Sequence, residues 1–366
     1  MGPSLAGITQ YEKSPIYSLK GIDQFVSVTV IIISSSLLTL ATNCMRTENS
    51  IQATPLYLGV DGGGSKTRAW LADEKGTVLG RGNTGTANIN YTTRTSAVAA
   101  IRAACTQAFR SARVTESKVS GAWLGLAGMA RACDRDWMKE QFSELAIKIE
   151  VSDDLHIAHC GGLAGDPGIV LVAGTGSACY GRNYTGQTWR CGGWGSLADD
   201  AGSASWLSQR AFQLAARQAD GRATGNAIKD VVFDFLKIKN SEDFSQAVEG
   251  LSRYSRAQIC PQLSSLYFEG NPLVKKLYKE AALALAEMIT VTARQLEFSS
   301  PNVILSGAIA SSKGPLNSLL CKELEKRLPT IQLCEPLYSP CAGAIMEAYR
   351  INNIDWRSNS ISHFAK

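Results

Sequence analysis

A run of three glycines between two short apolar segments is the feature that most constrains this chain. Residues 56–71 read LYLGVDGGGSKTRAWL, where Asp61 precedes the glycines and Ser65 and Lys66 follow them. The pattern predicts a strand, a tight glycine turn and a second strand. Because glycine has no Cβ, backbone N–H groups in such a turn can approach an anion closely. The segment therefore favours a phosphate-binding hairpin over an ordinary glycine-rich turn.

Two common phosphate-binding motifs do not fit this turn. A P-loop needs a lysine directly after its last glycine, but Ser65 separates Gly64 from Lys66, and a strand follows where a P-loop needs a helix. The dinucleotide-binding fingerprint also needs a helix, and Thr67 stands where its third glycine would be. What remains is a hairpin whose turn holds phosphate.

The composition is that of an ordinary globular protein with room for two domains. Of the 366 residues, 45% are hydrophobic and 19% are charged, and the formal net charge is +5. Without a lysine and arginine run, the sequence gives no argument for nucleic-acid binding. The ten cysteines form no C-x-x-C pair, which argues against zinc or iron–sulfur sites and for a reducing, cytoplasmic location. His156, His159 and Cys160 could bind a metal, but we favour a helix surface because no second ligand cluster is visible.

The first 55 residues differ from the rest of the chain. Residues 24–45 carry no charge and include FVSVTVIII, a length that suits a membrane span or the apolar part of a signal peptide. Six serines and threonines between Phe25 and Ala41 weaken the case for a membrane anchor, and Met45 offers an alternative start. We favour a targeting segment or an extension upstream of the true start, while membrane association or organelle targeting through residues 24–45 stays open.

From residue 56 onward, the pattern predicts the element order βββαβαβα, a mixed sheet between helices. Strands are expected at 56–62, 67–73, 78–82, 121–128 and 149–153, and helices at 97–112, at about 134–146 and from 153 onward. Residues 168–181, GIVLVAGTGSACYG, repeat the design of the opening hairpin, which indicates an internal duplication. Two such hairpins can hold one nucleotide from both sides. A helical stretch is expected at about 203–297, a strand at 302–308 and a last helix at 340–349.

Taken together, these motifs resemble those of the N-acetylglucosamine kinases and the related glucosamine and N-acetylmuramic acid kinases of the BadF/BadG/BcrA/BcrD-type ATPase family. The resemblance covers roughly residues 56–349, and its most specific part is GTGS followed by CGGWG and D-x-G-S. It implies an α/β fold, a two-domain actin-like ATPase of ribonuclease-H-like type with a nucleotide cleft between the domains. The expected divisions are an extension 1–55, domains 56–166 and 167–340, the second with a helical insertion, and a final segment 341–366 whose helix returns to the first domain.

The resemblance also implies an activity, the ATP-dependent phosphorylation of an amino sugar, most readily N-acetylglucosamine, at its 6-hydroxyl. Carried over by position, the residues that would bind ATP are Gly62, Gly63, Gly64, Ser65, Gly174, Thr175, Gly176, Ser177, Gly307 and Ser312. Those that would bind the sugar are Asn88, Asp154, Gly193, Trp194, Gly195 and Asp200. Asp61 would hold Mg²⁺ through water, and Asp154 would be the catalytic base. The implied cofactors are ATP and Mg²⁺, and a homodimer is compatible with the resemblance.

General chemistry supports these roles. Phosphoryl transfer depends on positioning and charge neutralisation, and a carboxylate near the attacking hydroxyl can accept its proton. Asp154 could instead cap a helix, although its neighbour Asp153 is the better candidate for that role. Trp194 could equally pack in the core.

Several alternatives stay open at this point. The family usually has Gly-Asp-Glu-Gly-Ser where residues 199–203 read DDAGS, so the sugar could be glucosamine or N-acetylmuramic acid. A second class comprises switch ATPases that activate a partner reductase or dehydratase, but these carry a cysteine-held cluster whose spacing this chain lacks. A sensor without catalysis is disfavoured by the presence of Asp61, Asp154 and both glycine turns.

Overall fold

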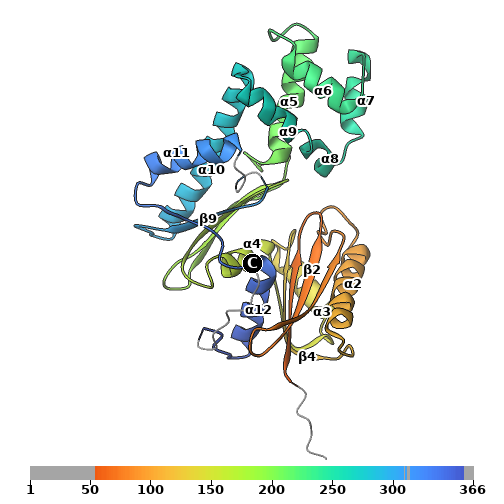
Figure 1. Cartoon of the computed structure of the whole chain (residues 1–366), viewed down its shortest axis with the longest axis vertical. Coiled ribbons are helices and arrows are strands. Elements are labelled where there is room, and N and C mark those ends of the chain that lie inside the picture. Colours follow the sequence, from red (N-terminus) through yellow and green to blue (C-terminus); the bar gives the residue numbers. More distant parts are fainter. Residues whose placement is uncertain (1–53, 309, 311–313, 358–366) are drawn as a thin grey trace, which may run out of the picture. The chain divides into compact units, whose positions relative to one another are not determined.

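The computed structural model describes residues 54–308, 310 and 314–357. Ser312, the apolar segment 24–45 and the last nine residues therefore lie outside the described residues. The first mixed sheet (Figure 1) contains β1 (Leu56–Gly62), β2 (Thr67–Asp73), β3 (Val78–Thr84), β4 (Val119–Leu126) and β5 (Ala146–Ser152). Its strand order is β3-β2-β1-β4-β5, with β1 to β3 antiparallel and β1, β4 and β5 parallel.

A second five-stranded sheet repeats this plan. It contains β6 (Gly168–Ala173), β7 (Ser177–Arg182), β8 (Thr188–Gly192), β9 (Asn302–Ser306) and β10 (Gln332–Cys334). Its order is β10-β9-β6-β7-β8. As in the first sheet, β6, β7 and β8 pair antiparallel, whereas β6, β9 and β10 run parallel. The predicted duplication is confirmed. Sequence patterns missed β8 and β10 because both are edge strands with few buried side chains.

Helices pack against the two sheets. Three of them follow β3, β4 and β5 of the first sheet along the chain: α2 (Arg94–Ala112), α3 (Ala132–Gln141) and α4 (Asp154–Gly162). α2 begins where the Thr93 side chain accepts a hydrogen bond from the Ser96 N–H, as a helix N-cap does. It lies very close to β3, since a Cβ on Gly82 would stand 1.9 Å from the Ala104 carbonyl oxygen. The glycines of β3 therefore set how closely this helix can pack.

The predicted helical stretch after residue 203 is divided into several shorter helices. They are α5 (Ala204–Ala219), α6 (Ala227–Leu236), η1 (Ser241–Asp243), α7 (Phe244–Glu249), α8 (Arg253–Ala257), α9 (Cys260–Phe268) and α10 (Pro272–Gln295). α10 starts at Pro272 behind the N-cap Asn271. Its apolar residues Ala281, Leu285 and Ile289 are buried in the core of the second sheet.

The last helices are α11 (Pro315–Arg327) and α12 (Pro340–Ile351). α12 packs on α4, where a Cβ on Gly343 would stand 2.1 Å from the Ile157 carbonyl oxygen. It also packs on the first sheet, because the Tyr349 ring meets Tyr57 edge-on at a centroid distance of 4.8 Å. Residues far apart in the sequence thus share one apolar cluster.

α4 carries His156, His159 and Cys160, the side chains that the sequence offers as possible metal ligands. His159 and Cys160 are buried, so the helix assignment is correct but the expected surface position is wrong. His159 Nε2 lies 3.1 Å from the Gly168 carbonyl oxygen, and burial lowers its pKa to about 3, which keeps the imidazole neutral. In the part of the chain that the structure describes, no group of three or more potential ligands is placed to hold a metal ion. Within the same residues, no helix combines the length and apolar character that crossing a bilayer requires.

Candidate active site

Two adjoining cavities lie next to the two glycine turns. The larger has a volume of about 780 Å³ and the smaller about 590 Å³. Both are lined by Ser65 of the β1–β2 turn, by Gly174 and Thr175 of the β6–β7 turn, and by Tyr254. The two turns predicted to bind phosphate therefore belong to the wall that the two cavities share.

The first turn is closed by a hydrogen bond from the Gly63 N–H to the Lys66 carbonyl, at 2.8 Å. Gly64 and Ser65 are exposed and line the larger cavity. Gly62 and Gly63, also predicted to bind ATP, line neither of these cavities. Packing explains the glycine at position 62 instead, because a Cβ there would stand 2.4 Å from Leu126 Cδ2.

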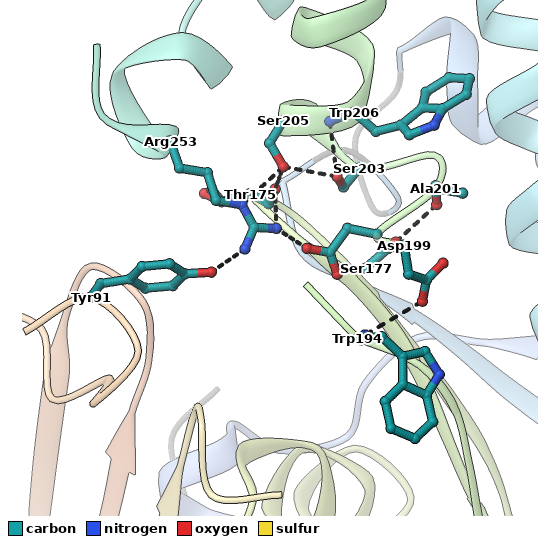
Figure 2. Close-up of polar contacts among 12 residues, drawn as sticks. Tyr91, Thr175, Ser177, Trp194, Asp199, Ala201, Ser203, Ser205, Trp206 and Arg253 are labelled. Carbon is teal, nitrogen blue, oxygen red and sulfur yellow. Dashed lines mark hydrogen bonds and ion pairs between the residues drawn. The ribbon is translucent and has the colours of Figure 1, made fainter. Parts of the chain in front are cut away.

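The second turn is held by the start of α5. The Ala204 N–H donates to the Gly174 carbonyl at 2.9 Å, and the Ser205 N–H donates to the Thr175 carbonyl at 3.3 Å. Ser203 caps this helix by accepting from the Trp206 N–H, which explains the serine of the D-x-G-S motif (Figure 2). Gly176 and Ser177, the rest of the predicted second loop, line the larger cavity.

Asp154 is the first residue of α4 and lines the larger cavity. Asp153 is the N-cap, as predicted, because its carboxylate accepts from the His156 N–H at 3.0 Å. Asp154 is thus left free of the capping role. Burial is the largest cause, and together with the neighbouring charges of Asp153 and Asp61 it raises the pKa of Asp154 to about 7.

Asp61 ends the apolar part of β1 and is only 15% exposed at its side chain. Burial raises its pKa to about 6, while the Arg68 guanidinium, 3.4 Å away, acts in the opposite direction. Asp61 lines neither cavity, although its charge acts on Asp154.

The residues predicted on the sugar side lie together in the larger cavity. Its lining includes Asn88, Asp154, Gly193, Trp194, Gly195 and Asp200. Trp194 is 78% exposed, so the core-packing alternative is wrong. Asn88 is tied to the first turn through Thr86, whose hydroxyl accepts from the Asn88 N–H and donates to the Gly63 carbonyl, each at 3.1 Å.

The smaller cavity is bordered by α5, α9 and the chain that follows β9. Its lining includes Leu207, Pro261, Tyr278, Ala308 and Leu316. Gly307, predicted to border the adenosine, directly precedes Ala308 and has φ +89°; a Cβ there would stand 2.5 Å from the Ala173 carbonyl oxygen. This glycine lets the end of β9 approach the end of β6, where the second turn begins.

Several residues of the larger cavity carry no signal in the sequence that marks them as site residues. These are Asn90, Tyr91, Gly128, Arg190, Ser252 and Arg253. Arg253, at the start of α8, bonds to Tyr91, Thr175 and Ser205 (Figure 2) and to the Asp200 carboxylate. Burial raises the pKa of Asp200, and Arg253 opposes that rise. No local signal marked Arg253, because it follows an ordinary serine N-cap far from both glycine turns.

The chain is similar to several known sugar kinases along most of its length. Over 297 residues the chain is 28% identical to an N-acetylmuramic acid/N-acetylglucosamine kinase of Clostridium acetobutylicum, covering 80% of this chain and 97% of that protein. It is 26% identical to the N-acetyl-D-glucosamine kinase of Dictyostelium discoideum over 311 residues, with the same two coverages. The structure of a candidate N-acetylglucosamine kinase from Chromobacterium violaceum superposes with a TM-score of 0.66 at 25% identity, covering 80% of this chain and 98% of that one.

The family model described as the BadF/BadG/BcrA/BcrD ATPase family matches residues 58–348, which is most of the chain. The duplicated mixed sheets and the structural likeness also confirm the predicted two-domain actin-like ATPase fold. The chain therefore belongs to the BadF/BadG/BcrA/BcrD ATPase family.

Proposed function

We propose that this protein is an ATP-dependent amino-sugar kinase that transfers the γ-phosphoryl group to the 6-hydroxyl of N-acetylglucosamine. The observation that carries the proposal is the junction of two cavities at the glycine turns. The smaller cavity is lined in part by Leu207, Pro261 and Leu316, apolar side chains suited to a nucleoside. The larger one has carboxylates, an amide and an exposed indole suited to a sugar. Phosphate groups held at Ser65, Gly174 and Thr175 would stand between the two substrates.

Asp154 would act as the general base. In the reaction, the sugar 6-oxygen forms a bond to the γ-phosphorus while the bond from that phosphorus to the ADP oxygen breaks, and the hydroxyl proton passes to the Asp154 carboxylate. A pKa near neutrality suits this role, because the group can both accept the proton and release it again. The backbone N–H groups of the two turns would hold the phosphates.

The carboxylates also fit a divalent cation. Asp61 and Asp154 are partly buried and repel each other, so a bound Mg²⁺ would relieve their charge while neutralising the phosphates. Asp61 is the residue that would hold it, through water. Asp200, Asn88 and Trp194 would recognise the sugar, with Trp194 offering a flat apolar face.

A coupled ADP-release assay with a panel of hexosamines tests the proposal. N-acetylglucosamine should stimulate ADP release, and mass spectrometry should find a phosphorylated sugar. Faster reaction with glucosamine or N-acetylmuramic acid would correct the substrate and keep the kinase. ADP release that no sugar stimulates, and that depends instead on a partner reductase or dehydratase, would replace the proposal with a switch ATPase.

A further inference from the structure

The Arg253 guanidinium is shared among four residues from four segments of the chain. Nε donates to Ser205 Oγ at 3.0 Å, and Nη1 donates to the Tyr91 hydroxyl. Nη2 donates both to the Thr175 carbonyl, at 3.2 Å, and to the Asp200 carboxylate. Figure 2 shows Arg253 between Tyr91 on one side and Ser205 and Thr175 on the other. The Arg253 side chain is only 14% exposed, so these contacts replace water.

Three of the residues that Arg253 bonds to line one or both of the cavities. Thr175 lines both cavities and lies in the second glycine turn, whereas Asp200 and Tyr91 line only the larger one. Tyr91 follows the first sheet's strand β3, while Arg253 lies on α8, beyond the second sheet's β8. The Arg253 side chain therefore connects three parts of the protein: the second glycine turn, the wall of the larger cavity and the segment that follows β3.

The bond to Thr175 also acts on the group expected to bind phosphate. The Thr175 carbonyl and the Gly176 N–H belong to one planar peptide unit, so fixing the carbonyl fixes the direction of that N–H. The same Nη2 also bonds to Asp200. A sugar hydroxyl that draws the Asp200 carboxylate toward itself must therefore change how Arg253 holds the second turn.

We propose that Arg253 is a positioning residue that couples the binding of the two substrates. It does so by joining Asp200, which lines the larger cavity, to Thr175 in the second glycine turn. This inference rests on the proposed function. Coupling of this kind is reciprocal, so the sugar tightens nucleotide binding by the same factor as the nucleotide tightens sugar binding. The site is then complete for transfer only when both substrates are present.

Calorimetric titration of a non-hydrolysable ATP analogue, with and without saturating N-acetylglucosamine, tests the inference. In the wild type, the sugar should tighten analogue binding by at least about 5-fold, the lower end of typical coupling. Arg253→Lys keeps a positive charge beside Asp200 but lacks the planar fork that serves several acceptors. We expect its coupling factor to fall to about 1 to 2, with each separate affinity changed less than the coupling.

Arg256→Lys is the matched control, since it makes the same change one turn along α8 on a residue that lines neither cavity. It should keep the wild-type coupling. If Arg253→Lys does not fold, Arg253→Gln replaces it: the shorter amide cannot join the Asp200 carboxylate to the Thr175 carbonyl, so the coupling should fall as well.

The possible results distinguish the coupling proposal from the kinase proposal. A wild type that binds both ligands independently, or an Arg253→Lys or Arg253→Gln variant with full coupling, overturns the inference and leaves the kinase proposal standing. A wild type that binds the analogue but no amino sugar overturns both. An equal loss of coupling in Arg256→Lys would also overturn the coupling proposal, because the effect would then come from any arginine substitution in α8 and not from the bonds of Arg253.

Discussion

The carboxylates of Asp154 and Asp61 interact electrostatically, although one begins α4 and the other lies in β1. Burial first, and then the charges of Asp153 and Asp61, together raise the pKa of Asp154 to about 7. Burial likewise raises the pKa of Asp61 to about 6. Both shifts disfavour the ionised form that the proposed chemistry needs, so the site is costly to charge until cations enter it.

The pH dependence of the reaction should follow Asp154. The base acts only when ionised, so kcat/KM should rise with pH and level off above about pH 7. Asp154→Asn cannot accept the proton and should lower kcat by about 10²–10⁴-fold while both substrates still bind. Steady-state rates across pH and calorimetric binding are the measurements. A variant with near-normal kcat would remove Asp154 from the mechanism.

Stability should change in the opposite direction to activity at this residue. Because the folded pKa of Asp154 lies above the ordinary value of 3.8, folded protein keeps a proton that the unfolded chain releases between about pH 4 and pH 7. Its carboxyl therefore contributes less stability as the pH rises through this window. We expect the Tm of Asp154→Asn at pH 8 to equal or exceed that of the wild type. A clearly lower Tm would show that the ionised carboxylate stabilises the fold.

Asp61→Asn should raise the magnesium concentration needed for half-maximal rate by about 10–100-fold, the effect typical of outer-shell metal partners. The physical reason is the loss of a partly buried negative charge next to the first glycine turn. A magnesium titration of the rate measures it. Asp166→Asn, which changes an exposed carboxylate paired with Arg357, should leave the titration unchanged. Equal magnesium curves for Asp61→Asn and the wild type would contradict the assignment.

Thr175→Val should weaken nucleotide binding and leave the fold intact. The backbone carbonyl of Thr175 carries its bonds to Ser205 and Arg253, and valine keeps that carbonyl. Losing one hydrogen bond to a charged phosphate costs about 1.5–3 kcal/mol, or roughly 10- to 150-fold in affinity. Calorimetry gives the affinity, and Thr290→Val on α10 is the control. Unchanged nucleotide affinity and turnover would mean that the second turn does not use this hydroxyl.

Trp194→Ala should separate sugar recognition from stability. Because Trp194 is 78% exposed, its removal should change the free energy of unfolding by no more than about 0.5 kcal/mol, as for most surface positions. Loss of the indole face should weaken N-acetylglucosamine binding by roughly 10-fold, which corresponds to about 1.4 kcal/mol. Thermal unfolding and sugar titration measure the two effects. A large drop in Tm with normal sugar affinity would reverse this interpretation.

Two glycine substitutions should behave differently. Gly307→Ala places a Cβ 2.5 Å from the Ala173 carbonyl oxygen at φ +89°, so it should destabilise the protein by more than about 1–2 kcal/mol. At Gly64 a Cβ would meet nothing within 4 Å, so Gly64→Ala should keep the wild-type Tm and impair only ATP use. Thermal unfolding and ATP kinetics test the pair. Equal Tm values would show that the end of β9 can relax.

The amino-acid sequence by itself determined the local parts of this protein. The two glycine hairpins, most strands, the Asp153 cap and the duplicated element order follow from neighbouring residues, because turn chemistry and apolar periodicity are local properties. The family motifs likewise lie within short segments, so Asn88, Asp154 and Trp194 can be identified from the sequence alone.

Only the tertiary structure decided what lies beside what. The Tyr91 hydroxyl and the Arg253 guanidinium meet across 162 residues of chain, and neither carries a local signal for that contact. The burial of His159, the exposure of Trp194 and the junction of the two cavities at Thr175 likewise depend on how distant segments pack. Local patterns report the conformation of a segment, whereas hydrogen-bond partners and burial arise from packing between segments, which no single stretch of sequence contains.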